Sequence, residues 1–367
     1  MAQHFLLSAA SRTLSPRSIY KAGEDAAYAT FCEMRWPESN GEAVCPQCSH
    51  DEAYKITTRR KFKCKACARQ FSVTSGTILT SRKMDFVDLL AAICIIVNAS
   101  KGVSMVQLSR DLDCQYKTAF VLAHKLREAM AQEVQTGAKL QGHVEIDGAY
   151  FGGHIRPENA KADRKDRRLK RHQNGRRRVV VTMRERHGRT LPILTMNEGK
   201  GVALAIKNVS RTATMSADEA SHWDLLHNGW MVERVNHSEI YSDHGKHTNM
   251  VESFFSRLRR MVVGQHHHVS PAYLHQYANH AAWLEDNRRT DNGTLAHVLV
   301  SNAMDAPVSR SWKGYWQRAP RIPLTVRTSV NRSRLSVLPY DNQKLRRSGL
   351  VALPPLFETL VVVDLGM

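Results

Sequence analysis

Four cysteines arranged as two C-x2-C pairs constrain the fold of this chain more than any other feature. Cys45 is paired with Cys48, and Cys64 with Cys67. Each C-x2-C turn presents two thiolates, and two such turns on facing hairpins complete a tetrahedral zinc site with no open position. We therefore expect these residues to hold a structural Zn²⁺ in a zinc ribbon.

Disulfide bonds are the alternative use of paired cysteines, and they are typical of secreted proteins. Residues 1–30 lack a basic start followed by an apolar core and a cleavage site, which favours a reducing compartment. No apolar run reaches the roughly 18 residues that a membrane span requires. We expect zinc rather than disulfides, and no membrane partner.

The charge of the chain indicates a polyanionic partner. Its 367 residues carry a formal net charge of +19, from 53 Lys and Arg against 34 Asp and Glu. Nucleic acid is the first candidate, although a ribosome-associated or membrane-surface protein can also be this basic. The densest basic run spans residues 161–178. We interpret it as a loop that contacts DNA phosphates, with a merely solvated loop as the alternative; the residues assigned to this contact are Arg167, Arg168, Arg171, Arg176 and Arg177.

The N-terminal part divides into three segments. Residues 1–40 form a helical lead-in, residues 41–82 the zinc ribbon, and residues 83–135 a helical segment. In the ribbon, the basic residues Arg59, Arg60 and Lys61 stand between the two knuckles, where a rigid platform can lie against a DNA backbone.

The helical segment has the layout of a helix-turn-helix. Ser104 is placed to cap a helix over residues 105–112, and a turn separates it from a second helix over residues 116–130. In a helix-turn-helix, the start of the second helix would offer Gln115 and Lys117 to the major groove. An ordinary packed helix pair fits the same spacing.

The pattern changes after residue 140. Alternating apolar residues predict strands over residues 144–147, 179–183 and 191–196, and a short strand over residues 213–215 leads into residues 216–218. A weak helix over residues 202–209 precedes that short strand. Helices follow over residues 249–262 and 271–288. This order predicts an α/β fold, an RNase H-like mixed sheet flanked by helices, over residues 140–300. No role is assigned to the tail, residues 301–367.

Three acidic residues end elements of this predicted domain. Asp147 ends the first strand, Asp218 follows the fourth, and Glu252 lies on the next helix. Cleavage of a phosphodiester by two divalent cations needs such carboxylate ligands. Asn249 shares a helix face with Glu252, and Arg259 returns to that face two turns later, where it can bind a phosphate. Spacing alone leaves Glu219 and Asp224 open as alternatives to Asp218.

These blocks resemble a known family. The segments 144–153, 216–219, 235–238, 247–252, 264–270 and 287–289 look like successive blocks of bacterial insertion-sequence transposases that join an N-terminal zinc ribbon to a DDE domain. The resemblance implies an RNase H-like core, Mg²⁺ or Mn²⁺ dependence, DNA strand transfer, a protein at least dimeric on DNA and a nucleoid-associated cytoplasmic location. It makes Asp147 and Asp218 the first two catalytic acids, and leaves Glu252 or Asn249 as the third.

The chain departs from the family at two places. Gly148 stands where relatives commonly have a second acid, and His280-Ala281 stands where a later helix usually carries Glu-Phe. The sequence thus favours a transposase that cleaves and joins DNA at the terminal repeats of its element. A non-catalytic zinc-ribbon DNA-binding protein, such as a transposase relic or regulator, is the main alternative.

Overall fold

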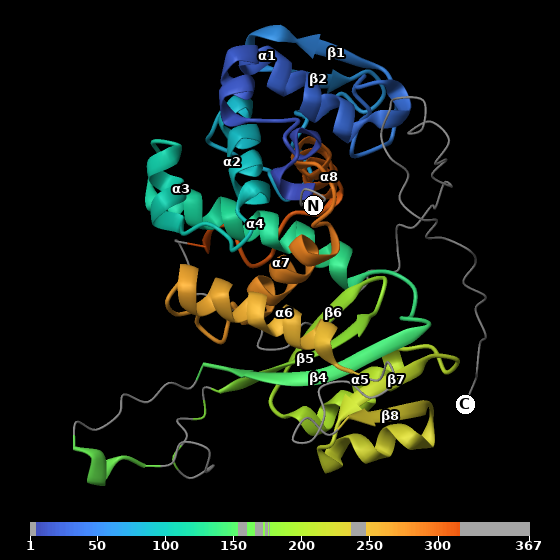
Figure 1. The fold of residues 1–367 in the computed structure, drawn as a ribbon. Coiled ribbons are helices and arrows are strands. Elements are labelled where there is room, and N and C mark those ends of the chain that lie inside the picture. The colour runs from blue at the N-terminus through green and yellow to red at the C-terminus, as the bar shows by residue number, and fades with distance from the viewer. Residues whose placement is uncertain are drawn as a thin grey trace. The chain divides into compact units, whose positions relative to one another are not determined.

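The computed structural model describes residues 5–152, 160–165, 172, 175, 177–235 and 247–315 (Figure 1). These residues belong to one compact unit, Met1–Leu324. Four residues of the predicted basic loop, Arg167, Arg168, Arg171 and Arg176, lie outside the described residues, as does the tail beyond residue 315.

The N-terminal region contains a long helix followed by the ribbon. Helix α1 (Pro16–Arg35) begins at Ser15, whose side chain accepts a hydrogen bond from Ser18 N, and it bends at Gly23, where φ is +85°. The ribbon strands β1 (Ala53–Ile56), β2 (Lys61–Cys64) and β3 (Gln70–Phe71) form an antiparallel sheet in that order. Trp36 packs edge-on against Phe62 at 5.5 Å between ring centroids, which attaches the ribbon to the end of α1.

Three further helices follow the ribbon within the helical segment predicted over residues 83–135. Helix α2 (Phe86–Asn98) is buried on most of its surface, α3 (Met105–Asp111) is short, and α4 (Tyr116–Gln135) extends beyond the predicted end at residue 130. Ser104 caps α3 as expected, because its Oγ accepts a hydrogen bond from Gln107 N at 3.1 Å. Gly102 lies in the turn between α2 and α3 and has a φ of +75°. Residues other than glycine rarely adopt this conformation.

The second half of the described chain is a mixed α/β domain built on a five-stranded sheet. The strands are β4 (His143–Phe151), β5 (Arg178–Glu185), β6 (Thr190–Thr195), β7 (Thr214–Asp218) and β8 (Met231–Val235), in the order β6-β5-β4-β7-β8. β4 pairs antiparallel with β5 and parallel with β7. The expected α/β class and mixed sheet are confirmed. Two details differ: β4 continues to Phe151, beyond the predicted end at residue 147, and β8 was not predicted.

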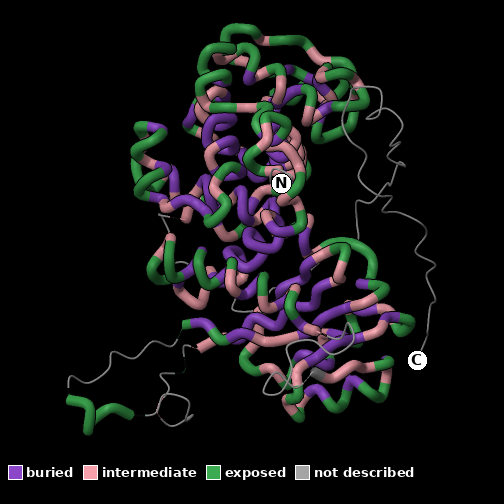
Figure 2. Tube along the Cα trace, viewed as in Figure 1, coloured by how far each residue is buried: buried purple, intermediate pink, exposed green. Residues whose placement is uncertain are grey.

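Helices cover both faces of this sheet (Figure 1). Helix α5 (Gly201–Asn208) lies on one face, where Val144 and Ile146 of β4 share an apolar core with Val202 and Trp223. Helices α6 (Asn249–Arg259) and α7 (Leu274–Asp286) lie on the other, where Ala149 and Phe151 join a second core. That core continues through α2, α4 and the unpredicted α8 (Asn292–Asp305), as the buried interior in Figure 2 shows.

None of the helices in the described part of the chain combines the length and the hydropathy that a membrane span requires.

A buried cation without a carboxylate partner marks the contact between α4 and α7. Arg127 is 2% exposed, and its Nε and Nη1 have no hydrogen-bond partner among the described residues. Its guanidinium lies over the ring of Tyr277 at 4.2 Å. His280 is also buried, and burial lowers the pKa of His280 well below its ordinary value, with the charge of Arg127 acting in the same direction. His280 is therefore neutral, and it does not supply the negative charge that an acid at this position would provide.

We expect His280→Glu to stabilise the protein. A carboxylate at this position would pair with Arg127, and loss of one partner from a buried pair typically costs about 3 to 5 kcal/mol. Because the carboxylate must itself be desolvated, we expect a gain of about 1 to 2 kcal/mol in the free energy of unfolding near neutral pH. Urea denaturation measures it. The control His268→Glu, at an exposed position, should change the stability little, and a destabilised His280→Glu protein would contradict the expectation.

Candidate active site and zinc centre

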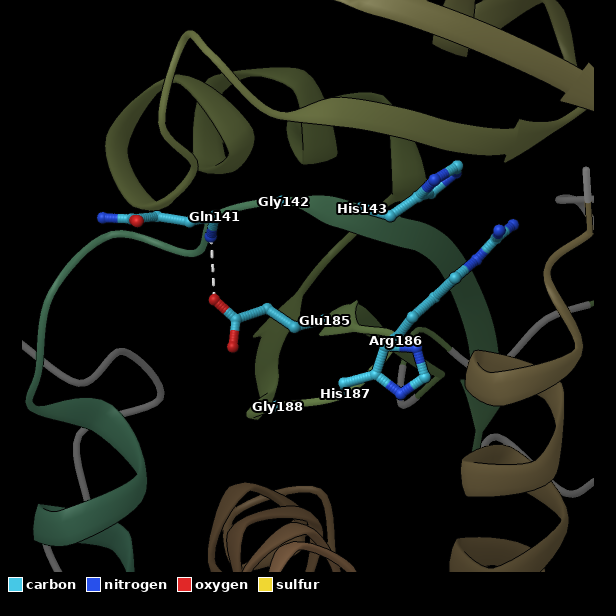
Figure 3. Close-up of a pocket in the computed structure, with 7 residues that line it drawn as sticks. All are labelled: Gln141, Gly142, His143, Glu185, Arg186, His187 and Gly188. Carbon is cyan, nitrogen blue, oxygen red and sulfur yellow. Dashed lines mark hydrogen bonds between the residues drawn. The ribbon is translucent and has the colours of Figure 1, made fainter. Parts of the chain in front are cut away.

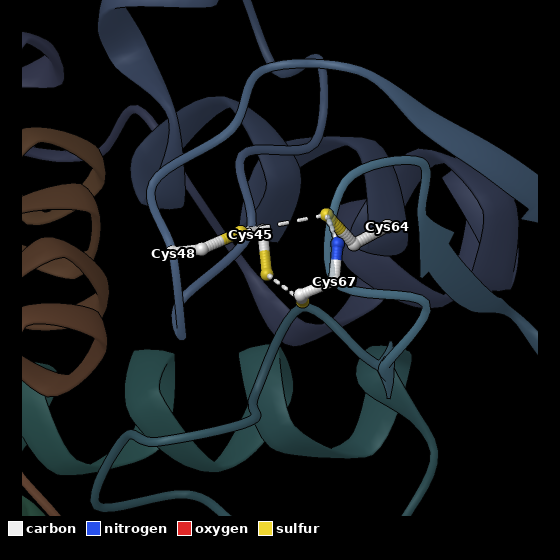
Figure 4. Close-up of side chains that lie close together, drawn as sticks. All are labelled: Cys45, Cys48, Cys64 and Cys67. Atoms are coloured by element: carbon white, nitrogen blue, oxygen red, sulfur yellow. Dashed lines mark hydrogen bonds between the residues drawn. The ribbon is translucent and has the colours of Figure 1, made fainter.

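The structure brings the four ribbon cysteines into one cluster (Figure 4). Their sulfur atoms all lie within 4.8 Å of one another, with 3.6 Å between the Sγ atoms of Cys45 and Cys67 and the same distance between those of Cys48 and Cys64. A tetrahedral site with Zn–S bonds of about 2.3 Å places its sulfurs about 3.8 Å apart. The thiolates therefore fit a structural zinc ion that closes the ribbon.

Asp147 and Asp218 lie on neighbouring parallel strands, just after their last paired residues. Asp218 is the last residue of β7, but Asp147 is in the middle of β4 and does not end its strand as the sequence analysis expected. In the register of β4 and β7, Ile146 faces Ala217, so the next residue on each strand is one of the two acids. Ile146 and Ala217 belong to the core on the α5 side. Because side chains alternate along a strand, both acids point toward the face that α6 covers.

Glu252 comes to this edge from the first turn of α6. It is half-buried, and its Oε1 accepts a hydrogen bond from Thr248 Oγ1 at 3.3 Å. Asn249 is the first residue of the same helix and is exposed. The α6 contacts with β4 and β5 hold this helix against the sheet.

The charges of the acids act on one another. Burial raises the pKa of Asp147 to about 7, and the charges of Asp218, Glu198 and Glu252 act in the same direction. A hydrogen bond of 2.7 Å from Gly148 N to Asp147 Oδ1 opposes this shift. The three acids predicted from the sequence are thus electrostatic neighbours, and a cation at this edge would relieve their repulsion.

Glu198 is a fourth acid in this group, and the sequence analysis did not identify it. It lies just after β6, and a Cβ placed on Gly148 would meet its Cγ at 2.3 Å and its Oε1 at 2.5 Å. Burial raises the pKa of Glu198, followed by the charge of Asp218. The glycine at position 148 thus leaves the space that the Glu198 side chain occupies. Because Gly148 and Glu198 are far apart in the sequence, the pattern of neighbouring residues could not predict this contact.

The carboxylates offer the hard oxygen ligands that Mg²⁺ and Mn²⁺ prefer. Within the described residues, only the four cysteines are gathered as tightly as the ligands of a single ion. A two-cation site does not require that arrangement, because its cations are themselves about 4 Å apart. The donor set therefore fits such a pair of cations, with Asp147, Asp218 and Glu252 as the residues that would hold it.

Two predicted phosphate ligands lie near this edge at different distances. Arg177 lies over the ring of Tyr150 at 3.8 Å, and its charge acts on Glu198. Arg259 is exposed on α6, with its guanidinium 5.9 Å from the ring centroid of Phe255. Seven residues of α-helix place it about 10 Å along the axis from Glu252. Arg177 thus acts electrostatically on one of the acids, Glu198.

The other predicted DNA-binding residues lie on the ribbon and at the start of α4. Arg59 and Lys61 are exposed, as are Gln115 and Lys117. Arg60 differs, because its two terminal nitrogens pair with Glu24 and Asp25 of α1. This intramolecular pairing gives Arg60 a structural role at the junction of α1 and the ribbon.

Comparison with known families agrees with this geometry. Residues 139–286 match the family described as the ISXO2-like transposase domain, and residues 22–70 match the transposase zinc-ribbon domain. These matches include the four cysteines and all four acids. The chain belongs to the insertion-sequence transposases that join an N-terminal zinc ribbon to a DDE domain. Comparisons with curated proteins and with solved structures gave no significant match.

We expect the ribbon to depend on zinc. Cys45→Ser should lower the zinc content well below one ion per chain and expose the ribbon to proteolysis, because metal binding supplies most of the folding energy of such modules. Atomic absorption and limited proteolysis measure the two effects. Cys114→Ser, which alters a thiol outside the cluster, should retain the zinc. A Cys45→Ser protein with full zinc content would refute the assignment.

The raised pKa of Asp147 predicts that ionisation of this side chain lowers the stability of the folded protein at high pH. An acid whose pKa rises from 3.8 to about 7 on folding keeps its proton longer in the folded state, so stability falls as the pH rises between these values. In zinc-loaded protein without added Mg²⁺ or Mn²⁺, we expect Asp147→Asn to be more stable than wild type by roughly 2 kcal/mol at about pH 8. The difference should shrink as the pH falls below about 7, because wild-type Asp147 then becomes neutral.

Denaturation curves over this pH range measure the difference. Glu219→Gln, which neutralises the exposed acid next to Asp218, is the matched control and should show no such gain. Added Mn²⁺ should stabilise the wild type and not Asp147→Asn, since only the wild type has the complete ligand set. An Asp147→Asn protein less stable than wild type at high pH would contradict the raised pKa.

Proposed function

We propose that this protein is an active transposase that binds the terminal repeats of its insertion sequence and catalyses DNA cleavage and strand transfer. The grouping of Asp147 of β4, Asp218 at the end of β7 and Glu252 of α6 carries the proposal. The transposase family match over the same residues supports it. A DNA-binding protein without catalysis would not require partly buried acids to lie close together, where their charges repel one another.

In the proposed reaction, Asp147, Asp218 and Glu252 hold two Mg²⁺ or Mn²⁺ ions. When bound by these residues, the cations would supply activation of the attacking oxygen and neutralisation of charge on the leaving oxygen. Cleavage joins a water oxygen to phosphorus and releases the 3′-oxygen of the element end. In strand transfer, that 3′-hydroxyl attacks a phosphodiester of the target DNA, so that a new P–O bond joins the element to the target and the 3′-oxygen of the target strand leaves. The residues contribute mainly by positioning and by charge stabilisation.

DNA recognition is assigned to the N-terminal segments. Arg59 and Lys61 on the ribbon would contact the backbone, and Gln115 and Lys117 at the start of α4 would enter a major groove. Arg177, beside the acids, would bind a phosphate near the scissile bond. Because two element ends must be held together for transfer, we propose that the protein is at least a dimer on DNA.

The test is a Mg²⁺-dependent assay on labelled element ends, with binding measured separately. We expect Asp147→Asn and Asp218→Asn to bind the terminal repeats as the wild type does and to lose cleavage and joining by at least about a thousandfold, as expected when a charge-stabilising ligand is removed. Glu252→Gln and Asn249→Ala identify the third ligand, since only the true ligand should give a comparable loss.

Glu219→Gln is the matched control, because it neutralises an exposed acid next to Asp218 and should leave cleavage unchanged. Undiminished cleavage by both aspartate variants would exclude these acids from the mechanism. Specific binding by a wild-type protein that never cleaves would instead favour the non-catalytic relic or regulator.

A further inference from the structure

Glu145 is a fully buried carboxylate that the proposed reaction does not use. Its side chain has no exposed surface. It lies on β4, two residues before Asp147, so both side chains are on the face of the sheet that α6 covers. An ionised side chain is buried only at a substantial cost unless several partners satisfy it.

One oxygen of Glu145 caps α6. Oε2 accepts hydrogen bonds from Met250 N at 2.9 Å and from Val251 N at 3.1 Å. The first amides of a helix have no intrahelical acceptor, and the helix dipole favours a negative charge there. The residue at the N-cap position, Thr248, does not cap the helix with its side chain. The cap of α6 is therefore provided by the central strand of the sheet.

The other oxygen of Glu145 lies beside the guanidinium of Arg186 and the imidazole of His247. Oε1 is 3.3 Å from Arg186 Nε and 3.1 Å from His247 Nδ1. Arg186, which extends from the end of β5 in Figure 3, also donates to the backbone oxygen of His247 at 3.3 Å. The pocket drawn in Figure 3 lies at the amino end of β4, away from Asp147 and Asp218. Through these contacts, one carboxylate holds residues 247–251 against β4.

A second buried carboxylate holds the same helix from α7. Glu285 pairs with Arg184 of β5 at 2.8 Å and with Arg257 of α6 at 2.8 Å, and Arg184 donates to Met250 O at 3.0 Å. Glu285 fixes α6 near both of its ends, whereas Glu145 contacts only the turn that carries Glu252. These contacts allow the two roles to be separated experimentally.

We propose that Glu145 is a positioning residue that sets the distance between Asp147 and Glu252. Its own strand carries Asp147 two residues later, and the amide of Val251, which it binds, precedes Glu252 directly. The cap therefore connects the strand that carries Asp147 directly to the helical turn that carries Glu252. This inference rests on the proposed function, because it assigns Glu145 a role in cation binding by that site. The alternative is that Glu145 only stabilises the fold.

The test uses Glu145→Gln, which preserves an acceptor oxygen and the shape of the side chain but removes the charge. We expect its Mn²⁺ affinity, measured by calorimetry on zinc-loaded protein, to fall at least tenfold, because partners of metal ligands typically contribute 10- to 100-fold. Hydrogen exchange should accelerate in residues 249–258 and not in α7. Binding to terminal-repeat DNA should remain within about twofold of wild type, because the groups assigned to DNA lie elsewhere.

Glu233→Gln is the matched control. Glu233 lies on β8 and its Oε2 is 3.1 Å from His143 Nε2, so its loss should change neither Mn²⁺ affinity nor exchange in α6. If Glu145→Gln does not fold, Glu145→Asp retains the charge on a side chain one methylene shorter, which should not reach both amides. For that variant we expect at least a threefold loss of Mn²⁺ affinity.

The outcomes separate the two proposals. A folded Glu145 variant with wild-type Mn²⁺ affinity would overturn the positioning role, while the proposed function would stand. A general loss of stability with unchanged Mn²⁺ affinity would show that Glu145 serves the fold alone. Wild-type Mn²⁺ binding that Asp147→Asn does not weaken would overturn the proposed site itself, and the positioning role with it.

Discussion

The parallel pairing of β4 with β7 is the constraint on which the candidate active site depends. Asp147 and Asp218 are far apart in the sequence, and only this pairing makes them the next residues on neighbouring strands. The two apolar cores, one on each face of the sheet, fix the register, since a slip by one residue would turn Asp147 toward the α5 side. Packing on the side away from the acids therefore determines where the acids point.

Electrostatic interactions then place the remaining parts around these strand ends. Glu145 and Glu285 are buried among arginines and helix amides, and they join the sheet to α6 and α7. Asp147 is partly buried with other acids nearby, and its raised pKa reflects that environment. The domain thus contains carboxylates that pair with arginines and carboxylates whose charged neighbours include other acids. This contrast distinguishes structural acids from candidate ligands.

Much of this arrangement could be predicted from the sequence, because its signals are local. The cysteine spacing, the cap at Ser104 and the apolar periodicity of α2, α4 and α6 each depend on neighbouring residues, and the structure contains these elements. Strand β8 was missed because it is a short edge strand whose first residue, Met231, is 73% exposed. Helix α8 was missed because small residues such as Gly293, Ala296 and Ala303 form much of its buried face, so its amphipathic contrast is low.

The parts of the site that escaped prediction depend on contacts between distant residues. Glu198 approaches Gly148, Glu145 caps α6, and Arg60 pairs with α1. In each case the local sequence shows only a charged residue of unspecified orientation. The resemblance to the family shows that acids common in relatives are absent at positions 148 and 280 of this sequence. Only the structure shows that Glu198 fills the space beside the first and that a neutral histidine near Arg127 occupies the second.

Helix α4 has a consequence for any DNA that the protein processes. Its first residues are exposed, while its far end donates from Gln135 to Pro192 O of β6 and to Asn279 of α7. Twenty residues of continuous helix span about 30 Å, close to nine base pairs of B-DNA. If the start of α4 binds the terminal repeat, the length of this helix fixes the distance between the recognised bases and the catalytic domain. The cut would then fall at a fixed number of base pairs from the recognised sequence, whatever bases lie between.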